Sequence, residues 1–338
     1  MRHIRRAAQA MIIASLLLLS ASSTALAQKG QSYDHDEIIE ESFKVAKGSL
    51  LTIDSDLGSI VIEGGRGNEI EVYIVKGANN VSRNEANKLF DRYKVSFDES
   101  GRGLEIRGDY DKPRGRMNWR KGIKVHYEIL VPEDMELDIK TSGGSIHAEN
   151  IAGNANLKTS GGSLQLRDLA GRVTGRTSGG SIQARELGGV ADLHTSGGSI
   201  NIEGGGGSID ARTSGGSINI TDVAGTVEAH TSGGTIRLKE IAGSVNAKTS
   251  GGSIEAEILG QPRDDMRLQT SGGSVTVHLD DDIRADIDAK ASGGSVSTDF
   301  AVSVRGTVKK TQLQGEINGG GPLLTLRTSG GSVRIREN

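Results

Sequence analysis

The chain has 338 residues, with 49 glycines, 3% aromatic residues, no cysteine and a formal net charge of −3. So few aromatic residues exclude a conventional globular core built on Phe and Trp. The lack of cysteine excludes disulfides, thiolate metal sites and a lipidated N-terminal cysteine, and the mild acidity argues against nucleic acid as a partner.

Residues 1–27 have the pattern of a secretory signal peptide. Three arginines precede an apolar run at residues 11–19, and Ala25-Leu26-Ala27 offers a cleavage site before Gln28. We expect cleavage after Ala27, because the apolar run is about half the ~20 residues that a membrane-spanning helix needs. Cleavage removes three arginines and changes the formal charge from −3 to −6. We therefore expect an exported mature chain without an integral membrane segment, located in the periplasm, on the cell surface or in the medium.

Residues 28–136 are predicted to form a small β-rich cap with one helix. The alternation of apolar residues predicts a strand, a turn and a strand within residues 49–62, and further strands at 70–75, 104–107 and 123–131. A helix is expected from Ser82 to Tyr93, because Ser82 and Glu85 fit a capping box. Ala86, Leu89, Phe90 and Tyr93 would share its packing face.

A loop at residues 108–122 mixes basic and aromatic side chains. Arginine matches carboxylate and phosphate groups, and an indole ring offers a stacking face. One interpretation is a contact surface for an anionic polymer, and the other is a solvated hairpin tip. The candidate contact residues are Arg114, Arg116, Trp119 and Arg120.

Residues 137–338 contain the dominant pattern, the motif Thr-Ser-Gly-Gly-Ser-Ile or a close variant repeated every 18 residues. Six copies follow one another from Thr141 to Lys248, and looser copies begin at residues 249, 270, 291 and 328, which gives ten Ser-Gly-Gly copies. Such a period predicts a solenoid in which each coil buries its apolar side against the next. We therefore expect an all-β fold: a right-handed β-helix of about ten coils. A left-handed hexapeptide helix has the same period, but it needs an aliphatic residue where this unit has a basic one.

Counting from the threonine, positions 6, 8, 15 and 17 are aliphatic or small, which predicts two short inward-facing strands per coil. Glycines at positions 3, 4 and 13 would form the corners, either through a positive φ or through close approach to the neighbouring coil. The same alternation turns each threonine inward, so we expect an internal hydroxyl ladder rather than a flat, ice-binding array. The terminal charges Arg334, Arg336 and Glu337 are expected to protect an exposed edge.

Position 18 forms a column of basic residues and histidines. A basic column suits an anionic polysaccharide, and Lys158, Arg176, Arg212 and Lys248 are the candidate contacts. The alternative is a charge-balanced sheet face, because position 16 of the same face contains Asp192, Asp210 and Glu228. The full column is Lys140, Lys158, Arg176, His194, Arg212, His230 and Lys248, with Lys290 and Arg327 in equivalent places.

We predict no catalytic residue, cofactor or metal site. His194 and His230 lie two coils apart, about 10 Å by the strand spacing, which is too far to share a metal ion. The aspartates between residues 280 and 288 lack the glycine and spacing of calcium loops, so a solvated loop is preferred. The sequence also lacks a G-x-S-x-G elbow, an H-E-x-x-H motif and a P-loop.

The sequence resembles the bacterial putative-adhesin family of β-strand repeat proteins of unknown function. The resemblance rests on three stretches: residues 55–60, the Thr-Ser-Gly-Gly-Ser-Ile array, and residues 315–333. It implies an exported β-solenoid, and it carries no catalytic residues to this chain. We expect a non-enzymatic, adhesin-like scaffold that binds an envelope polysaccharide or a surface protein. The alternatives are a periplasmic sensor or stress-response component and, third, a polysaccharide-processing β-helix enzyme.

Overall fold

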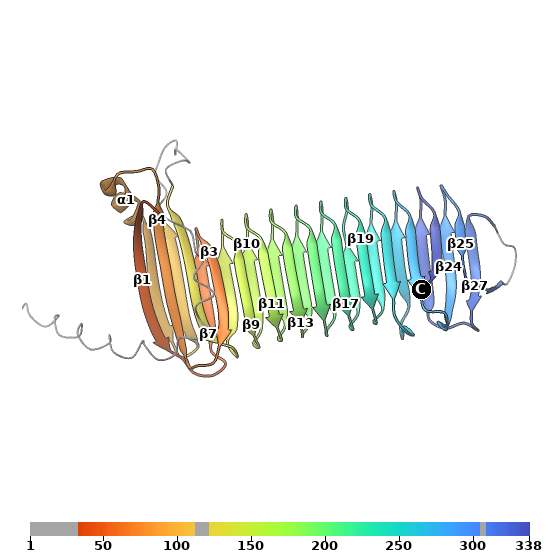
Figure 1. The fold of residues 1–338 in the computed structure, drawn as a ribbon, viewed down its shortest axis with the longest axis horizontal. Coiled ribbons are helices and arrows are strands. Elements are labelled where there is room, and N and C mark those ends of the chain that lie inside the picture. The colour runs from red at the N-terminus through yellow and green to blue at the C-terminus, as the bar shows by residue number, and fades with distance from the viewer. Residues whose placement is uncertain (1–32, 112–121, 305–308) are drawn as a thin grey trace, which may run out of the picture.

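The chain forms a long stack of coils, and the strands of these coils make up two β-sheets. The computed structural model describes residues 33–111, 122–304 and 309–338. Sheet A has 14 strands and sheet B has 15, and each repeat contributes one strand to each sheet. The strands lie across the long axis of a rod, with β1 near one end and β27 near the other (Figure 1). The predicted β-solenoid is therefore confirmed.

The strands of the repeat region alternate between the two sheets and pair in parallel with the equivalent strands of adjacent coils. Sheet A contains β9 (Ile146–Ile151), β11 (Leu164–Leu169), β13 (Ile182–Leu187), β15 (Ile200–Gly205), β17 (Ile218–Val223), β19 (Ile236–Ile241), β21 (Ile254–Ile258) and β23 (Val275–Leu279). Sheet B contains β8 (Glu136–Thr141), β10 (Ala155–Thr159), β12 (Val173–Thr177), β14 (Ala191–Thr195), β16 (Ile209–Thr213), β18 (Val227–His230), β20 (Val245–Thr249) and β22 (Met266–Thr270).

The regions before and after the regular array complete the two sheets. The N-terminal elements are β1 (His35–Lys44), β2 (Leu50–Ser55), β3 (Ser59–Gly65), β4 (Glu69–Ala78), α1 (Arg83–Phe90), β5 (Tyr93–Ser100), β6 (Gly103–Tyr110) and β7 (Lys124–Pro132). The C-terminal elements are β24 (Ala285–Ala291), β25 (Val296–Thr298), β26 (Val302–Val304), β27 (Gln312–Ile317), β28 (Leu323–Thr328) and β29 (Val333–Glu337).

The core is thin and almost entirely aliphatic in the repeat region. Positions 6, 8, 15 and 17 of the unit face inward as predicted, and their side chains are buried. Small and large residues complement one another between coils: a Cβ on Gly175 would lie 2.8 Å from Cδ2 of Leu193 in the next coil. The repeated threonine is also buried, so the internal hydroxyl ladder is confirmed.

Close approach, not a positive φ, explains the repeated glycines at positions 4 and 13. A Cβ on Gly198 would lie 2.1 Å from the carbonyl oxygen of Gly180, and one on Gly189 would lie 2.3 Å from that of Gly171. Gly197, at position 3, has more room, because its Cβ would be 3.5 Å from the nearest atom. Positions 4 and 13 therefore need glycine so that the corners of successive coils can stack.

A positive φ occurs instead at position 10, the last residue but one of each sheet A strand from β9 to β19. The φ angles there lie between 53° and 58° for the five non-glycine residues, and Gly204 has a φ of 80°. This left-handed position was not predicted from the sequence. The sequence feature that indicates it is the type of residue at position 10, because asparagine and aspartate tolerate this conformation better than most residues. The five residues are Asn150, Asp168, Glu186, Asp222 and Glu240.

Both ends of the rod contain a coil that is out of sequence order. At the N-terminal end, the β2–β3 coil lies between the β6–β7 coil and the β8–β9 coil. At the C-terminal end, the last coil, β28–β29, lies between β22–β23 and β24–β25. Figure 1 accordingly shows the C-terminus inside the array.

The prediction that Arg334, Arg336 and Glu337 protect an exposed sheet edge is therefore wrong. β29 pairs with β23 along residues 333–337 and with β25 along residues 333–335, so most of its backbone is paired on both sides. The edge belongs to β25 and to β26, which the chain forms before it returns to insert β28 and β29.

The N-terminal region follows the predicted pattern with two differences. The helix has the expected capping box at Ser82 and buries Ala86 and Phe90, but it ends at Phe90. Tyr93 instead starts β5, and its hydroxyl bonds with those of Ser55 at 2.7 Å and Tyr127 at 2.5 Å. Strands β1 and β5 were not predicted, because β1 is mostly exposed and rich in acidic residues.

Candidate functional site

The basic residues at position 18 form one continuous column on the outer face of sheet B. Each residue pairs in register with the next, from β8 to β20, and the intervening position 17 is buried in every coil. With strands about 4.8 Å apart, seven successive side chains extend along roughly 29 Å of the rod. We call these residues the basic column: Lys140, Lys158, Arg176, His194, Arg212, His230 and Lys248.

The column continues beyond Lys248 with a break and a change of order. Gln269 follows Lys248, Arg327 follows Gln269, and Lys290 is last. Lys290 and Arg327 are thus equivalent to the column residues, as predicted, but the inserted last coil places Arg327 first.

Acidic residues at position 16 of the repeat, on the same face of sheet B, neutralise the arginines in the middle of the column. Arg176 pairs with Asp192 at 2.9 Å. Arg212 lies 2.6 Å from Asp210 and 3.3 Å from Glu228. Arg176 and Arg212, the two candidate ligand contacts of the column that are arginines, are therefore already paired with carboxylates of the same face.

Asp210 lies at the centre of three carboxylates on successive coils. Burial raises its pKa, Arg212 opposes that rise, and the charges of Glu228 and Asp192 add to it. Its Oδ1 is buried and has no hydrogen-bond partner among the described residues. Arg212 is consequently held between carboxylates that repel one another.

Lys158 and Lys248 differ from the two arginines. Their neighbours at position 16 are Asn156 and Asn246 rather than acids. Within residues 33–111, 122–304 and 309–338, no carboxylate lies within ion-pair distance of either ammonium group. Each of these exposed lysines can bind an external anion without first losing a protein partner.

An open groove of about 480 Å³ lies beside one part of the basic column. It follows the last residues of the sheet B strands from β14 to β20, where they enter the Ser-Gly-Gly corner. Ser232 and Ser250 are exposed and add hydroxyl groups to the cationic lining. The groove is lined by His194, Arg212, Thr213, His230, Thr231, Ser232, Lys248 and Ser250. This combination of cations and hydroxyl donors can hold an anionic, oxygen-rich ligand.

The other predicted contact surface, Arg114, Arg116, Trp119 and Arg120, lies outside the described residues. Their role therefore stays a prediction.

The aspartates near residue 280 take part in local contacts that join the C-terminal coils. Asp280 accepts hydrogen bonds from the backbone of Gly260 at 2.6 Å and from Asn338 at 2.7 Å. Among the described residues, no group of three or more His, Asp or Glu side chains could hold a metal ion.

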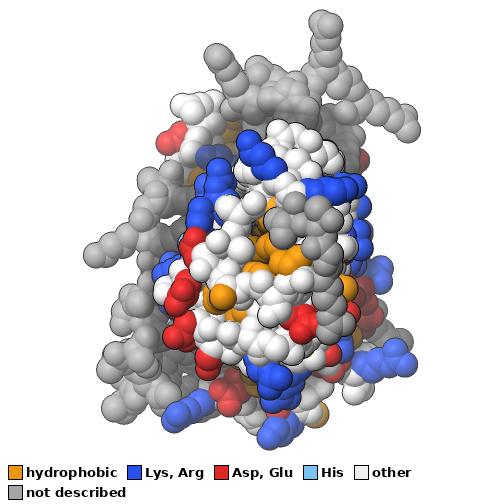
Figure 2. Space-filling view, turned by 90° about the vertical axis from the view of Figure 1, so that its right-hand side faces the viewer, with side chains coloured by type: hydrophobic (Ala, Val, Ile, Leu, Met, Phe, Trp, Pro, Cys, Tyr) orange, Lys and Arg blue, Asp and Glu red, His pale blue; other side chains and the backbone are white. Residues whose placement is uncertain are grey.

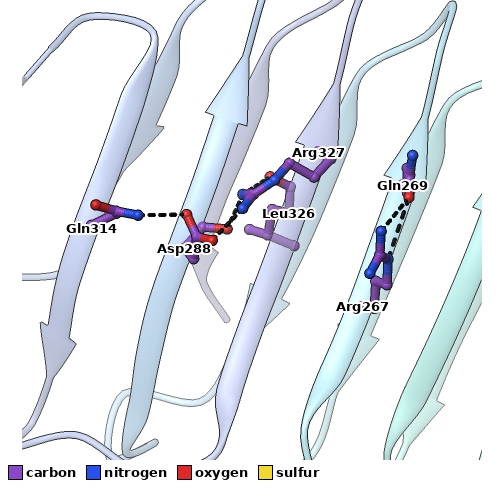
Figure 3. A network of polar contacts seen from close by, with 6 residues as sticks. All are labelled: Arg267, Gln269, Asp288, Gln314, Leu326 and Arg327. Atoms are coloured by element: carbon purple, nitrogen blue, oxygen red, sulfur yellow. Dashed lines mark hydrogen bonds and ion pairs between the residues drawn. The ribbon is translucent and has the colours of Figure 1, made fainter.

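Arg327 joins the inserted last coil to β24. Its guanidinium bonds with the Asp288 carboxylate and, at 2.6 Å, donates to the Asp288 carbonyl, while Gln314 bonds with the same carboxylate at 3.2 Å (Figure 3). Burial alone would raise the pKa of Asp288, but the bonds from Arg327 and Gln314 outweigh it and hold that pKa below its usual value. Arg327 is thus committed to this contact.

The described part of the chain contains no helix with the length and apolar character needed to cross a membrane. The signal peptide expected at residues 1–27 lies outside the described ranges.

The stacked coils and two facing sheets define a β-solenoid with an exposed, charged face on sheet B. The chain belongs to the Toastrack DUF4097 family, whose sequence profile matches residues 49–336. No curated protein shows significant similarity to this sequence.

Several solved structures are similar to this chain at low sequence identity. A putative adhesin from Bacteroides fragilis is 12% identical, with a TM-score of 0.36, over 89% of this chain and 97% of its own. A putative adhesin from Parabacteroides merdae is 14% identical, with a TM-score of 0.35, over 88% and 96%. A putative lipid binding protein from Parabacteroides distasonis is 15% identical, with a TM-score of 0.29, over 88% and 96%.

Proposed function

We propose that the protein is an exported, non-enzymatic binding scaffold of the cell envelope that holds a linear anionic polysaccharide along sheet B. The observation that carries this proposal is the basic column, with seven successive cationic or imidazole side chains in register on one flat face. A polymer with regularly spaced negative charges can contact several of these side chains at once.

The rigidity of the face favours such a ligand. Backbone pairing on both sides fixes the strands, so binding requires ordering of side chains but no folding of a loop. Each single contact at an exposed site is weak, at about 0.2–1 kcal/mol. Several contacts along one polymer add through effective concentration, which allows useful avidity from weak individual sites.

Lys158 and Lys248 are the two contacts that we expect to contribute most. The carboxylates that already pair with Arg176 and Arg212 must compete with any external anion. Lys248 also lines the groove, where Ser232 and Ser250 can donate hydrogen bonds to sugar oxygens.

The binding test uses polygalacturonate, a linear polymer of carboxylated sugars, with neutral dextran as the control ligand. We expect polygalacturonate to bind with an affinity that falls as salt is added, and dextran not to bind. Replacing both lysines, Lys158→Ala with Lys248→Ala, should weaken binding by about tenfold, since ~1.4 kcal/mol corresponds to a factor of ten. The matched control, Arg237→Ala with Lys239→Ala on sheet A, should bind like the parent.

Two results would overturn this function. One is equal binding of dextran and polygalacturonate, and the other is unchanged affinity in the double lysine variant. Thermal unfolding of each variant verifies that the fold is intact.

The location of the protein is tested separately by protease treatment of intact cells, with a periplasmic protein as the control. Loss of the protein while the control survives supports a surface adhesin. Protection of both supports a periplasmic role, where a sensor or stress-response component that binds a dedicated protein becomes the better proposal.

A further inference from the structure

The two ends of the rod differ from its regular middle, because each leaves strand edges without a neighbour. At the N-terminal end, β1 pairs only with β4 and β5 pairs only with β6 among the described strands. At the C-terminal end, β25 pairs with no strand but β29 and β26 with none but β27 within the described ranges, although the Val296 amide of β25 already donates to the carbonyl oxygen of Lys310 at 2.9 Å. Unpaired edges of this kind are templates for pairing with another chain.

Both ends also leave part of the apolar core accessible. We define the N-terminal end face as β1 and β5 with the partly buried side chains Ile39, Phe43, Val95 and Phe97. The Phe43 and Phe97 rings, 5.4 Å apart, pack across the two sheets.

The C-terminal end face consists of β25 and β26 with the partly buried side chains Val296, Phe300, Val302 and Val304. Figure 2 shows apolar side chains near the centre of this end, with charged side chains around them. A solenoid normally requires a polar cap at such an end to remain soluble, so an apolar centre points to a covering partner.

Strand β1 at one end is acidic, and two exposed lysines lie beside the end face at the other. β1 contains four carboxylates and one lysine within ten residues, and most of its side chains are exposed. Beside the C-terminal end face, Lys309 and Lys310 are exposed, and the carbonyl of Lys310 accepts a hydrogen bond from Val296 of β25. Two N-terminal faces would repel one another, whereas an N-terminal and a C-terminal face attract.

The strand directions and the lengths of the sheets are compatible with the same contact. β1 is antiparallel to β4, and β4 is antiparallel to β7, so β1 runs in the direction of the repeat strands of sheet A, including β25. Sheet A projects beyond the first coil by two strands, β4 and β1, against the single strand β5 of sheet B. Sheet B projects beyond the last coil by β27 and β26. Sheet A is thus longer by one strand at the N-terminal end and sheet B is longer by two strands at the C-terminal end, so the longer sheet of each end faces the shorter sheet of the other.

From these observations we propose that the protein associates head to tail with copies of itself, the N-terminal end face of one against the C-terminal end face of the next. This contact is heterologous, so it generates an open filament and not a closed dimer. The three-residue lengths of β25 and β26 limit the number of new backbone bonds. We therefore expect association only at high protein concentration, with lower affinity in high salt.

The test measures sedimentation over a wide range of protein concentrations for the parent protein and two charge-reversal variants. The N-end variant is Glu40→Lys with Glu41→Lys, and the C-end variant is Lys309→Glu with Lys310→Glu. All four residues are exposed, so both variants should fold like the parent, which thermal unfolding verifies. We expect the mass of the parent to rise with concentration and each variant alone to remain monomeric.

Mixing the two variants provides the decisive arm. The mixture restores opposite charges at every junction, because the lysines of one variant face the glutamates of the other. We therefore expect association to return to the parent level, while the sheet A control Arg237→Glu with Lys239→Glu associates like the parent. A monomeric parent at all concentrations, parent-like association of either end variant alone, or a monomeric mixture would each overturn the proposal.

Discussion

The Thr159 hydroxyl donates a hydrogen bond to the carbonyl oxygen of Gly144 at 2.7 Å, one coil earlier, and accepts one from the amide of Gly162 at 3.3 Å. A single buried side chain thereby joins the corners of two successive coils. The equivalent threonines make the same contacts along the array, for example Thr195 with Gly180 and Gly198. The hydroxyl ladder is therefore a stabilising feature of the interior.

We expect Thr195→Val to destabilise the protein by ~1–3 kcal/mol, because it leaves the Gly180 carbonyl and the Gly198 amide without a partner at a buried site. Thr195→Ser, which keeps the hydroxyl, should lose clearly less. Urea unfolding of both variants measures the difference. Equal losses would mean that the methyl group contributes as much to stability as the hydroxyl, which contradicts this prediction.

Replacing each of two adjacent corner glycines by alanine should change the free energy of unfolding by very different amounts. The added Cβ of Gly198→Ala would lie 2.1 Å from a backbone oxygen that cannot move without displacing its coil, so we expect a loss of about 3 kcal/mol or more. Gly197→Ala adds a Cβ with ordinary 3.5 Å contacts and should change stability by less than about 1 kcal/mol. Similar unfolding midpoints for the two variants would contradict the close-approach explanation.

The left-handed residue at position 10 predicts a stabilising change. Glu186 has a φ of 53°, a conformation that costs most side chains roughly 1–2 kcal/mol. Glu186→Asn should raise the free energy of unfolding by up to about 1 kcal/mol, and Glu186→Val should lower it. If thermal unfolding shows that the Glu186→Val variant is more stable than the Glu186→Asn variant, the position does not carry this strain.

The repeat region was largely predictable because its constraints are local and recur every 18 residues. The inward positions, the threonine ladder and the alignment of Lys158, Arg176, Arg212 and Lys248 all follow from one short period. The interleaved coils at the two ends were not predictable, because the motif at Thr328 is identical whether its coil is last or inserted beside Thr270. The ion pairs of Arg176 and Arg212 depend on side-chain geometry. From the sequence alone, the column could be either a ligand contact or a charge-balanced sheet face.

The buried tyrosines predict a loss of stability at alkaline pH. Burial is the main cause that raises the pKa of Tyr93 and of Tyr127 above the usual value near 10. Because the folded state keeps these protons while the unfolded state releases them, their contribution is complete below about pH 10 and falls as the pH rises further. Tyr127→Phe should reduce the slope of unfolding free energy against pH above pH 10 by up to ~1.4 kcal/mol per pH unit. An unchanged slope would show that Tyr127 ionises equally in both states.

The repeat period itself can be tested by deletion. Removing residues 195–212 joins His194 to Thr213, which occupies the same position in its coil as Thr195, so every remaining strand keeps its sheet and its inward face. We expect this protein to fold with a circular dichroism spectrum like that of the parent. Removing only residues 204–212 takes away a sheet B strand and half a turn, which would direct the following coils to the wrong sheet. That shorter deletion should prevent folding, although it removes half as many residues. Folding of both proteins, or collapse of both, would contradict a stack of equivalent 18-residue coils.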